Sequence, residues 1–216
     1  MISLITANIG GLHSLDELRT LISAIKMHNP DVVILQEVII TDGKNALDTL
    51  QDELHFPHSE FTFKHDFSKD YGKGVLQEKS VIEGLGMLSK LAFQSERKDL
   101  PIIKGKDRWP RLAVKYSFDG FSVCNLHNSK LEESRAIAVP KLPDADIYAG
   151  DFNMQPDELA RHFNKKSSFT FKRYISFPSK NLTLDYVLLS KGEFQDLQVI
   201  EGVSDHNALF VKIDLD

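Results

Sequence analysis

Short apolar runs recur along the whole chain, and they constrain the fold more than any other feature of the sequence. The runs lie at residues 2–7, 31–36, 84–88, 112–116, 121–126, 145–149, 182–189 and 208–213. Apolar runs of this length between turn-forming residues are typical of buried β-strands. Asp119-Gly120 separates two of the runs and predicts a hairpin turn. The pattern therefore predicts a chain dominated by strands.

Helices are expected at only a few places. Residues 14–17 read Ser-Leu-Asp-Glu, which has the form of a capping box. The apolar residues after it follow at helical spacing and are Leu18, Leu21, Ile22 and Ile25. Asn29-Pro30 ends this helix. Two further helices are predicted, one near residues 44–54 and one that begins at Pro156, because proline suits the first helical position.

These elements predict the fold class. The chain opens as strand, helix, strand, and residues 61–80 are polar and contain glycines, so that we expect a long loop or irregular hairpin there. Many strands with few helices are typical of an α/β sandwich of two sheets flanked by helices. Because no repeat and no linker divides the sequence, we predict a single domain over residues 1–216.

The composition excludes several classes of protein. Hydrophobic residues make up 42% of the chain, which is enough to form a core and argues against disorder. The single cysteine, Cys124, lies in an apolar run and is expected to be a buried thiol. No apolar run approaches the ~20 residues of a membrane span, and the N-terminus lacks the basic segment of a signal peptide. We therefore expect a cytoplasmic protein with no membrane span and no obligate protein partner.

Polar residues with metal or acid–base chemistry stand at the ends of five apolar runs. These residues are Asn8, Glu37, His127, Asp151 and the pair Asp205-His206. A single aspartate or asparagine at a strand end is most often a turn former. Strand ends in a packed sheet converge on one edge, where loops on a rigid scaffold bind ligands. Five such ends together therefore favour a functional site.

Asp185 differs from these residues because it lies inside the apolar run at residues 182–189. A carboxylate in such a strand is costly unless it is paired. It either faces solvent on the polar side of an edge strand or orients a histidine, for which His206 is the natural candidate. A carboxylate–imidazole pair fixes the tautomer of the ring and raises its basicity.

Seven short motifs in a fixed order now identify a family. They are Thr-Ala-Asn-Ile at 6–9, Leu-Gln-Glu at 35–37, Gly-Leu-Gly-Met-Leu-Ser at 84–89, Asn-Leu-His at 125–127, Gly-Asp-Phe-Asn at 150–153, Leu-Asp-Tyr-Val at 184–187 and Ser-Asp-His at 204–206. Their set resembles the endonuclease/exonuclease/phosphatase superfamily, whose fold is that of deoxyribonuclease I, over residues 3–213. The resemblance implies a four-layered α/β/β/α sandwich of two mainly antiparallel sheets flanked by helices. It also implies hydrolysis of a phosphoester by direct attack of water.

The resemblance implies a Mg²⁺ or Mn²⁺ centre as well. Glu37 matches the metal-binding glutamate, and Asn8 and Asp205 match residues that complete the metal shell directly or through water. Mg²⁺ prefers hard oxygen ligands and usually keeps several waters, so that one or two carboxylates with the substrate phosphate suit it. Asn8 is also expected to lie near the substrate phosphate.

The remaining motif residues match catalytic positions. Asp151 matches the aspartate that positions or activates the attacking water, and Asn153 matches the amide that steadies the phosphoryl group. Asp185 and His206 match a coupled pair, and His127 matches a second catalytic histidine that contacts the phosphate. A carboxylate within hydrogen-bond reach of water can orient it and accept its proton.

Two further positions have weaker motifs. Glu83 stands where some of these proteins have a glutamate that supports the second histidine. Arg111 matches a basic position before the strand that leads to His127, where it either contacts substrate phosphate or is an ordinary surface arginine.

The substrate is the least constrained part of the prediction, since the motifs determine chemistry and not substrate. The chain has a net charge of −5, whereas proteins that wrap duplex DNA are more often basic. Two basic clusters nevertheless occur and fit either solvated loops or a nucleic acid, with Trp109 available to stack on a base. They comprise Lys104, Lys106, Arg108, Arg111 and Lys115, and Lys165, Lys166, Lys172 and Arg173.

Nucleic acid is the favoured substrate, as for a nuclease or a DNA-end-processing phosphodiesterase. Asn-Leu-His-Asn at residues 125–128 makes the abasic-site endonuclease branch of the superfamily a poorer match. The alternatives are a phosphatase or phosphodiesterase that acts on small phospho-metabolites or lipid head groups, and an inactive module that binds phosphate without cleaving it.

Overall fold

The computed structural model describes residues 1–41, 43–67, 81–163 and 174–215. The elements before the centre of the chain are β1 (Ile2–Asn8), α1 (Arg19–His28), β2 (Val32–Thr41), β3 (Lys44–Asn45), α2 (Ala46–Leu54), β4 (His58–Asp66), β5 (Val81–Ser89) and β6 (Gln94–Leu100). Those after it are β7 (Arg111–Ser117), β8 (Ser122–His127), α3 (Glu132–Ala138), the 3₁₀ turn η3 (Val139–Lys141), β9 (Ile147–Asp151), α4 (Pro156–Phe163), the 3₁₀ turn η4 (Pro178–Lys180), β10 (Asp185–Leu189), β11 (Glu193–Ile200) and β12 (Ala208–Asp214).

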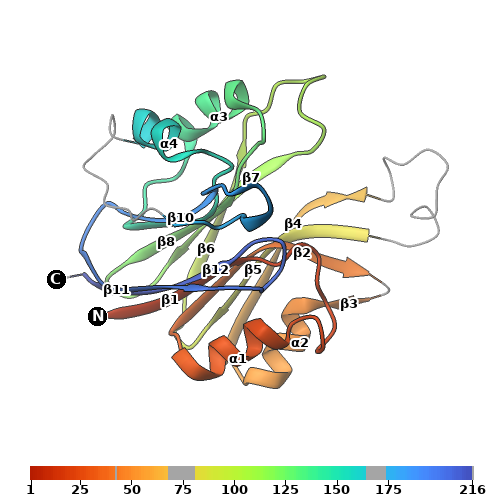
Figure 1. Ribbon diagram of the computed structural model, residues 1–216, viewed down its shortest axis with the longest axis vertical. Helices are drawn as coiled ribbons and strands as arrows, with labels where there is room; N and C mark the ends of the chain where they lie inside the picture. The colour runs from red at the N-terminus through yellow and green to blue at the C-terminus, as the bar shows by residue number, and fades with distance from the viewer. Residues whose placement is uncertain (42, 68–80, 164–173, 216) are drawn as a thin grey trace.

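The strands form two sheets that pack face to face. The larger has the order β11-β12-β1-β2-β5-β4, with β3 paired to β2, and the smaller has the order β10-β9-β8-β7-β6. Each sheet contains one parallel pair, β1 with β2 and β8 with β9, and the other pairs are antiparallel. Helices α1 and α2 cover the outer face of the larger sheet, and α3 and α4 that of the smaller (Figure 1). The four-layered α/β/β/α sandwich predicted from the sequence is confirmed.

Alternation along the strands explains the three layers of core. Successive side chains of a strand point to opposite faces, so that Leu4 packs between the sheets while Ile5 and Ala7 pack against α1 and α2. Tyr148 in β9 likewise faces the helices α3 and α4, whereas its neighbour Ile147 lies between the sheets. Cys124 is a buried free thiol, as expected.

The strands that the sequence did not predict lie at sheet edges. β6 carries mostly exposed polar side chains, β11 mixes exposed polar with partly buried apolar side chains, and β4 is the outer strand of the larger sheet. Residues 61–80 were predicted to form a long loop or irregular hairpin; residues 61–66 belong to strand β4, which pairs antiparallel with β5, so a loop is wrong there, and residues 68–80 lie outside the described residues. Polar side chains protect an exposed edge from pairing with another chain, and they remove the apolar pattern that would reveal the strand.

The predicted helices are present, but α1 begins later than its capping box indicated. Ser14 and Glu17 do form a capping box, with the Glu17 amide donating to Ser14 Oγ at 3.3 Å and the Ser14 amide donating to Glu17 Oε2 at 3.0 Å. The box closes a turn before α1, which begins only at Arg19. α4 begins at Pro156 and the hairpin turn at residues 119–120 joins β7 to β8, as predicted. No helix in the described ranges is long and apolar enough to cross a membrane.

Candidate active site

The predicted site residues gather where the two sheets meet at one edge. Asn8 ends β1, beside Gln36 of β2 in the parallel pair. His127 and Asp151 end the other parallel pair and are register partners, and Asp185 begins β10 opposite Asp151. Because parallel strands end at the same edge of a sheet, both sheets bring their polar ends to one place.

Glu37 reaches this place by a different route from the one expected. The sequence suggested that it ends its strand, but β2 continues to Thr41. The pairing of β2 with β5 shifts register between Leu35 and Val38, and Glu37 has a φ of +54°. A β-bulge re-aims a side chain, and a left-handed backbone is unfavourable for a residue other than glycine. The bulge therefore turns the Glu37 carboxylate toward the site.

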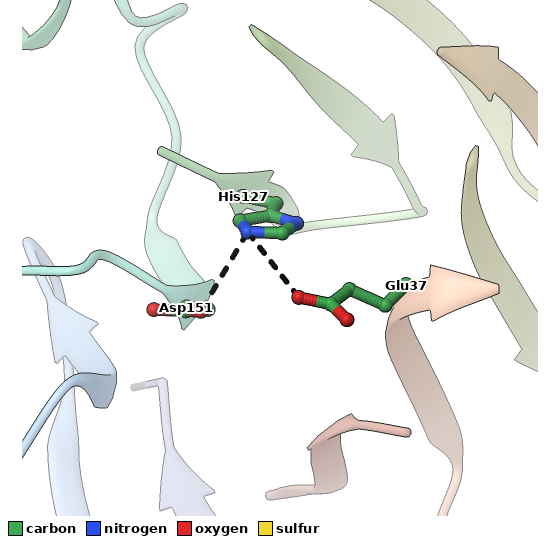
Figure 2. A group of neighbouring side chains, drawn as sticks. All are labelled: Glu37, His127 and Asp151. Carbon is green, nitrogen blue, oxygen red and sulfur yellow. Dashed lines mark ion pairs between the residues drawn. The ribbon is translucent and has the colours of Figure 1, made fainter. Parts of the chain in front are cut away.

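Glu37, His127 and Asp151 form the centre of the site (Figure 2). His127 Nε2 lies 3.7 Å from Glu37 Oε1 and 3.7 Å from Asp151 Oδ2. The Asn8 amide donates to the same two carboxylate oxygens, at 3.2 Å each. One side chain from the first strand thus holds the two carboxylates close together.

The backbone around Asp151 explains the Gly-Asp-Phe-Asn motif. Gly150 has a φ of +137°, and a Cβ there would lie 2.2 Å from the Leu126 carbonyl oxygen, so that only glycine lets β9 pass so close to β8. Asn153 has a φ of +52°, and its amide N–H donates to Asp151 Oδ1 at 2.8 Å. Its side-chain amide donates to the Asn128 carbonyl at 3.2 Å. The turn therefore positions one oxygen of Asp151.

The Asp151 carboxyl is tuned for proton transfer near neutral pH. Burial raises its pKa, the charge of Asp185 adds to this effect, and the charge of His206 opposes it, with the result that the pKa of Asp151 is about 7. A general base works best when its pKa lies near the working pH. Perturbed carboxyls of this kind are frequent at functional sites.

Asp185 and His206 form a buried pair, so the alternative of a solvent-facing Asp185 is excluded. His206 Nδ1 lies 2.7 Å from Asp185 Oδ2, and the two residues are 7% and 3% exposed. Burial lowers the pKa of His206, but the hydrogen bond to Asp185 and the charges of Asp185, Asp151 and Asp205 outweigh burial and raise it to about 9. The ring is therefore protonated at pH 7.

Two residues that the sequence did not indicate hold this pair. Ser176 Oγ accepts the amide N–H of Asp185 at 3.0 Å, and the ring of Phe177 packs on that of His206 with centroids 4.8 Å apart. They precede the strand by several residues and match no motif, so that only the folded chain brings them to the site.

His127 has the opposite charge state from His206. Burial, with the charges of Lys64, Arg111, Lys130 and His206, lowers the pKa of His127 well below its usual value. The ring is thus neutral at pH 7, and its 3.7 Å approaches to carboxylates are not ion pairs. Neither ring nitrogen has a hydrogen-bond partner in the described part of the chain. Nε2 faces Glu37 and Asp151 and is the nitrogen placed to contact a substrate, whereas Nδ1 faces Glu83.

Glu83 lies near His127 but does not hydrogen-bond to it. Glu83 Oε1 is 3.7 Å from His127 Nδ1, and the Glu83 carboxylate is ion-paired with the ammonium of Lys64. Lys64 is 3% exposed and was missed from the sequence because its strand was predicted to be a loop. The alternation with Phe63 gave no signal, because it predicts the apolar Phe63 inside and Lys64 in solvent, whereas Phe63 is exposed and Lys64 is buried.

Arg111 and Asp205 complete the predicted set. Arg111 is 7% exposed, so it is not a surface arginine. Asp205 is exposed, and neither of the two clusters of metal-ligating atoms found among the described residues includes it. The basic residues at 165–173 lie outside the described residues.

The donor atoms at the centre fit a hard divalent cation. One oxygen each from Glu37 and Asp151 and a nitrogen of His127 lie within 4.8 Å of one another. Two carboxylate oxygens that face each other favour a cation between them, because like charges in a partly buried site are costly unless they are compensated. Oxygen ligands of this number suit Mg²⁺ or Mn²⁺. Of the residues assigned to the metal from the sequence, Glu37 has this geometry, and Asp151 joins it.

Comparison with known proteins identifies the family. The model of the Endonuclease/Exonuclease/phosphatase family matches residues 5–206. A search of curated proteins finds no significant match. A solved endonuclease/exonuclease/phosphatase from Beutenbergia cavernae DSM 12333 is 17% identical, with a TM-score of 0.77, and the match covers 99% of this chain and 71% of that one.

Two further solved structures show the same fold with different substrates. One is D. rerio TDP2 complexed with a single-strand DNA product, 18% identical, with a TM-score of 0.67 and coverage of 99% of this chain and 98% of that one. The other is a mannosyl-6-phosphatase from Bacteroides thetaiotaomicron VPI-5482, 15% identical, with a TM-score of 0.65 and coverage of 99% and 100%. Identities this low establish the fold alone. The family model, which matches nearly the whole chain, establishes membership of a family of phosphoester hydrolases. This chain belongs to the endonuclease/exonuclease/phosphatase family.

Proposed function

We propose that the protein is a Mg²⁺-dependent phosphodiesterase that hydrolyses nucleic acid by direct attack of water. The observation that carries the proposal is the contrast in charge state at one sheet edge. Asp151 has a pKa of about 7, His206 is protonated and His127 is neutral. Such a separation of pKa values among neighbouring groups is what acid–base catalysis requires.

The side chains take distinct roles in this proposal. Asp151 orients the water and accepts its proton, because its pKa lies near neutrality and Asn153 and Asn8 each hold one of its oxygens. His206, charged and fixed by Asp185, donates to a phosphoryl oxygen. His127 donates a second hydrogen bond through an unpartnered ring nitrogen.

Glu37 would hold the cation, with Asn8 supporting its carboxylate and the exposed Asp205 as the second carboxylate, while Asp151 beside Glu37 is kept for the attacking water. When bound, the cation supplies charge that offsets the developing negative charge of the phosphoryl group. The facing carboxylates and the hard oxygen donors support this assignment.

A nucleic acid substrate is supported by the D. rerio structure with its DNA product and by basic side chains around the site. A second candidate is a phosphatase for small phosphorylated compounds. The mannosyl-6-phosphatase of the same fold favours it, and so does a cavity of about 380 Å³ beside Glu37, which is the size of a small-molecule site.

The test is cleavage of end-labelled single- and double-stranded DNA by the purified protein in Mg²⁺, with EDTA and the His206→Ala variant as controls. Cleavage that requires both the metal and His206 supports a nuclease, and the fragment lengths separate endonucleolytic from exonucleolytic attack. Folded protein that leaves DNA intact but releases phosphate from small phosphomonoesters favours the second candidate.

A further inference from the structure

A cavity of about 380 Å³ opens directly onto the site. Glu37 and His127 form one end of its lining, so they belong both to the cavity and to the cluster of facing carboxylates. Arg111 and Lys64 lie deeper, and Lys130 is an exposed residue at the rim. A molecule in this cavity would therefore adjoin a phosphate held at Glu37 and Asp151.

Arg111 is a buried cation in this cavity whose hydrogen bonding is incomplete. It is 7% exposed, and its Nε has no hydrogen-bond partner among the described residues. Burial lowers its pKa, and the nearby carboxylates of Glu83 and Asp151 oppose this effect through space. A buried guanidinium N–H without a partner costs free energy. An anion in the cavity would satisfy it.

The charge balance of the cavity favours an anion. Its lining contains five cationic side chains and three carboxylates, although the chain as a whole has a net charge of −5. The ion pair with Lys64 neutralises Glu83, which is the carboxylate whose charge acts most strongly on Arg111. The Asp107 carboxylate accepts hydrogen bonds from the hydroxyl groups of Ser129 and Ser134. Two of the three carboxylates are thus already paired or hydrogen-bonded.

The apolar part of the wall is rigid. The Trp109 ring packs against His65 and Phe67, with centroids 4.9 Å and 4.8 Å apart, and the guanidinium of Arg108 lies 4.6 Å from the ring centroid. Trp109 is therefore a packed wall and not the free stacking platform that the sequence suggested. A cavity with a buried guanidinium, cations at its rim and an aromatic wall has the size and chemistry for one nucleotide.

We propose that this cavity is a subsite for the nucleotide next to the scissile bond, with its phosphate bound by Arg111 and by Lys130 at the rim. The inference rests on the proposed function, which puts the scissile phosphate at Glu37 and Asp151. It narrows the substrate class to strands that carry a second phosphate one nucleotide from the cleaved bond. A small molecule with a single phosphate has no second phosphate for Arg111 to bind.

The test is calorimetric binding of thymidine dinucleotides that carry a terminal phosphate at the 5′ end, at the 3′ end or at neither. Binding is measured in Mg²⁺ with Asp151→Asn protein, and chromatography after the titration checks that the dinucleotide is intact. We expect one terminal phosphate to tighten binding at least about tenfold, the lower end for hydrogen bonds to charged groups. Arg111→Met should remove this advantage.

Two further variants keep the test decisive. Lys130→Met, at an exposed position, should reduce the advantage without risk to folding, whereas Arg19→Met, an exposed arginine paired with Asp16 away from the cavity, should leave it unchanged. Equal affinity for the three dinucleotides overturns the subsite, as does an advantage that survives in folded Arg111→Met protein.

Failure of the subsite and failure of the proposed function are separable. Wild-type hydrolysis of the dinucleotides in Mg²⁺ is measured alongside, with His206→Ala as control. Hydrolysis that depends on His206 without any effect of the terminal phosphate overturns the subsite alone. Absence of hydrolysis counts against the proposed function whatever the affinities show.

Discussion

Replacement of Asp185 by asparagine should change the charge state of His206 and, through it, the pH dependence of the reaction. The carboxylate lies 2.7 Å from His206 Nδ1 and contributes most to raising the pKa of the ring from its ordinary value of 6.5 to about 9. The difference corresponds to about 3 kcal/mol in favour of the charged ring. Because burial opposes the charge, Asp185→Asn should bring the pKa of His206 to 6.5 or below.

The size of the effect on rate follows from the fraction of charged ring. Wild-type His206 stays protonated up to about pH 9. At pH 8, a ring with a pKa of 6.5 is charged in only about 3% of molecules, so the Asp185→Asn variant should be about thirtyfold slower than wild type. Well below pH 6.5 both rings are charged and this part of the defect should disappear.

The same pair links pH to stability. A histidine whose pKa is raised on folding stabilises the folded state fully below its unfolded value of 6.5, and this contribution is lost as the pH rises through about 9. The stability advantage of wild type over Asp185→Asn that stems from this pair should therefore shrink between pH 6.5 and pH 9.

Two assays check this reasoning. The first is an NMR titration of the His206 imidazole in EDTA, and the second is the rate ratio of wild type to variant between pH 5.5 and pH 8.5. Asp196→Asn, a half-buried aspartate on the edge strand β11, is the matched control. A His206 that titrates near 6.5 in wild type, or near 9 in Asp185→Asn, would refute the assignment, as would a rate ratio that does not change with pH.

Three further predictions concern separate parts of the molecule. Asp151→Asn and His206→Ala should each lower the hydrolysis rate by at least about a hundredfold, since acid–base groups contribute about that much. Circular dichroism checks that the variants are folded, and near-normal turnover would remove the residue concerned from the mechanism. Glu37→Gln should weaken Mn²⁺ binding measured by electron paramagnetic resonance, because it removes a carboxylate from the cation site, and unchanged affinity would place the cation elsewhere. Phe210→Ala should lower the free energy of unfolding in urea by about 3–5 kcal/mol, since the side chain is 1% exposed and stacks on His28 at 4.2 Å; a loss below about 1 kcal/mol would contradict the packing.

The sequence predicted those parts of the site that depend on local pattern. Apolar runs located the buried strands, and the polar residues at their ends indicated where His127 and Asp151 would meet. The burial cost of a carboxylate was enough to suggest a partner for Asp185, and the structure places His206 at that position. Arguments of this kind succeed because the periodicity of a strand and the cost of burying charge are both local properties.

The features that escaped prediction depend on tertiary context. The bulge at Glu37 has no local signal, because the residues after it continue in an apolar strand. β6 and β11 lie at sheet edges, where β6 has a polar sequence and β11 has no continuous apolar run. Lys64 lies at the register shift of β4 between Phe63 and His65, and its buried ammonium is paired with Glu83 on the neighbouring strand β5. The opposite charge states of the two histidines depend on which carboxylates and cations surround each ring.

The central claim is that this sheet edge performs metal-dependent hydrolysis of phosphodiesters. Its most direct test is the release of p-nitrophenol from bis(p-nitrophenyl) phosphate by protein stripped with EDTA and then supplied with Mg²⁺, beside the His206→Ala variant. The account predicts no release in EDTA, release on addition of Mg²⁺, and a loss of at least about a hundredfold in the variant. Equal release by wild type and variant, or release that persists in EDTA, would contradict it.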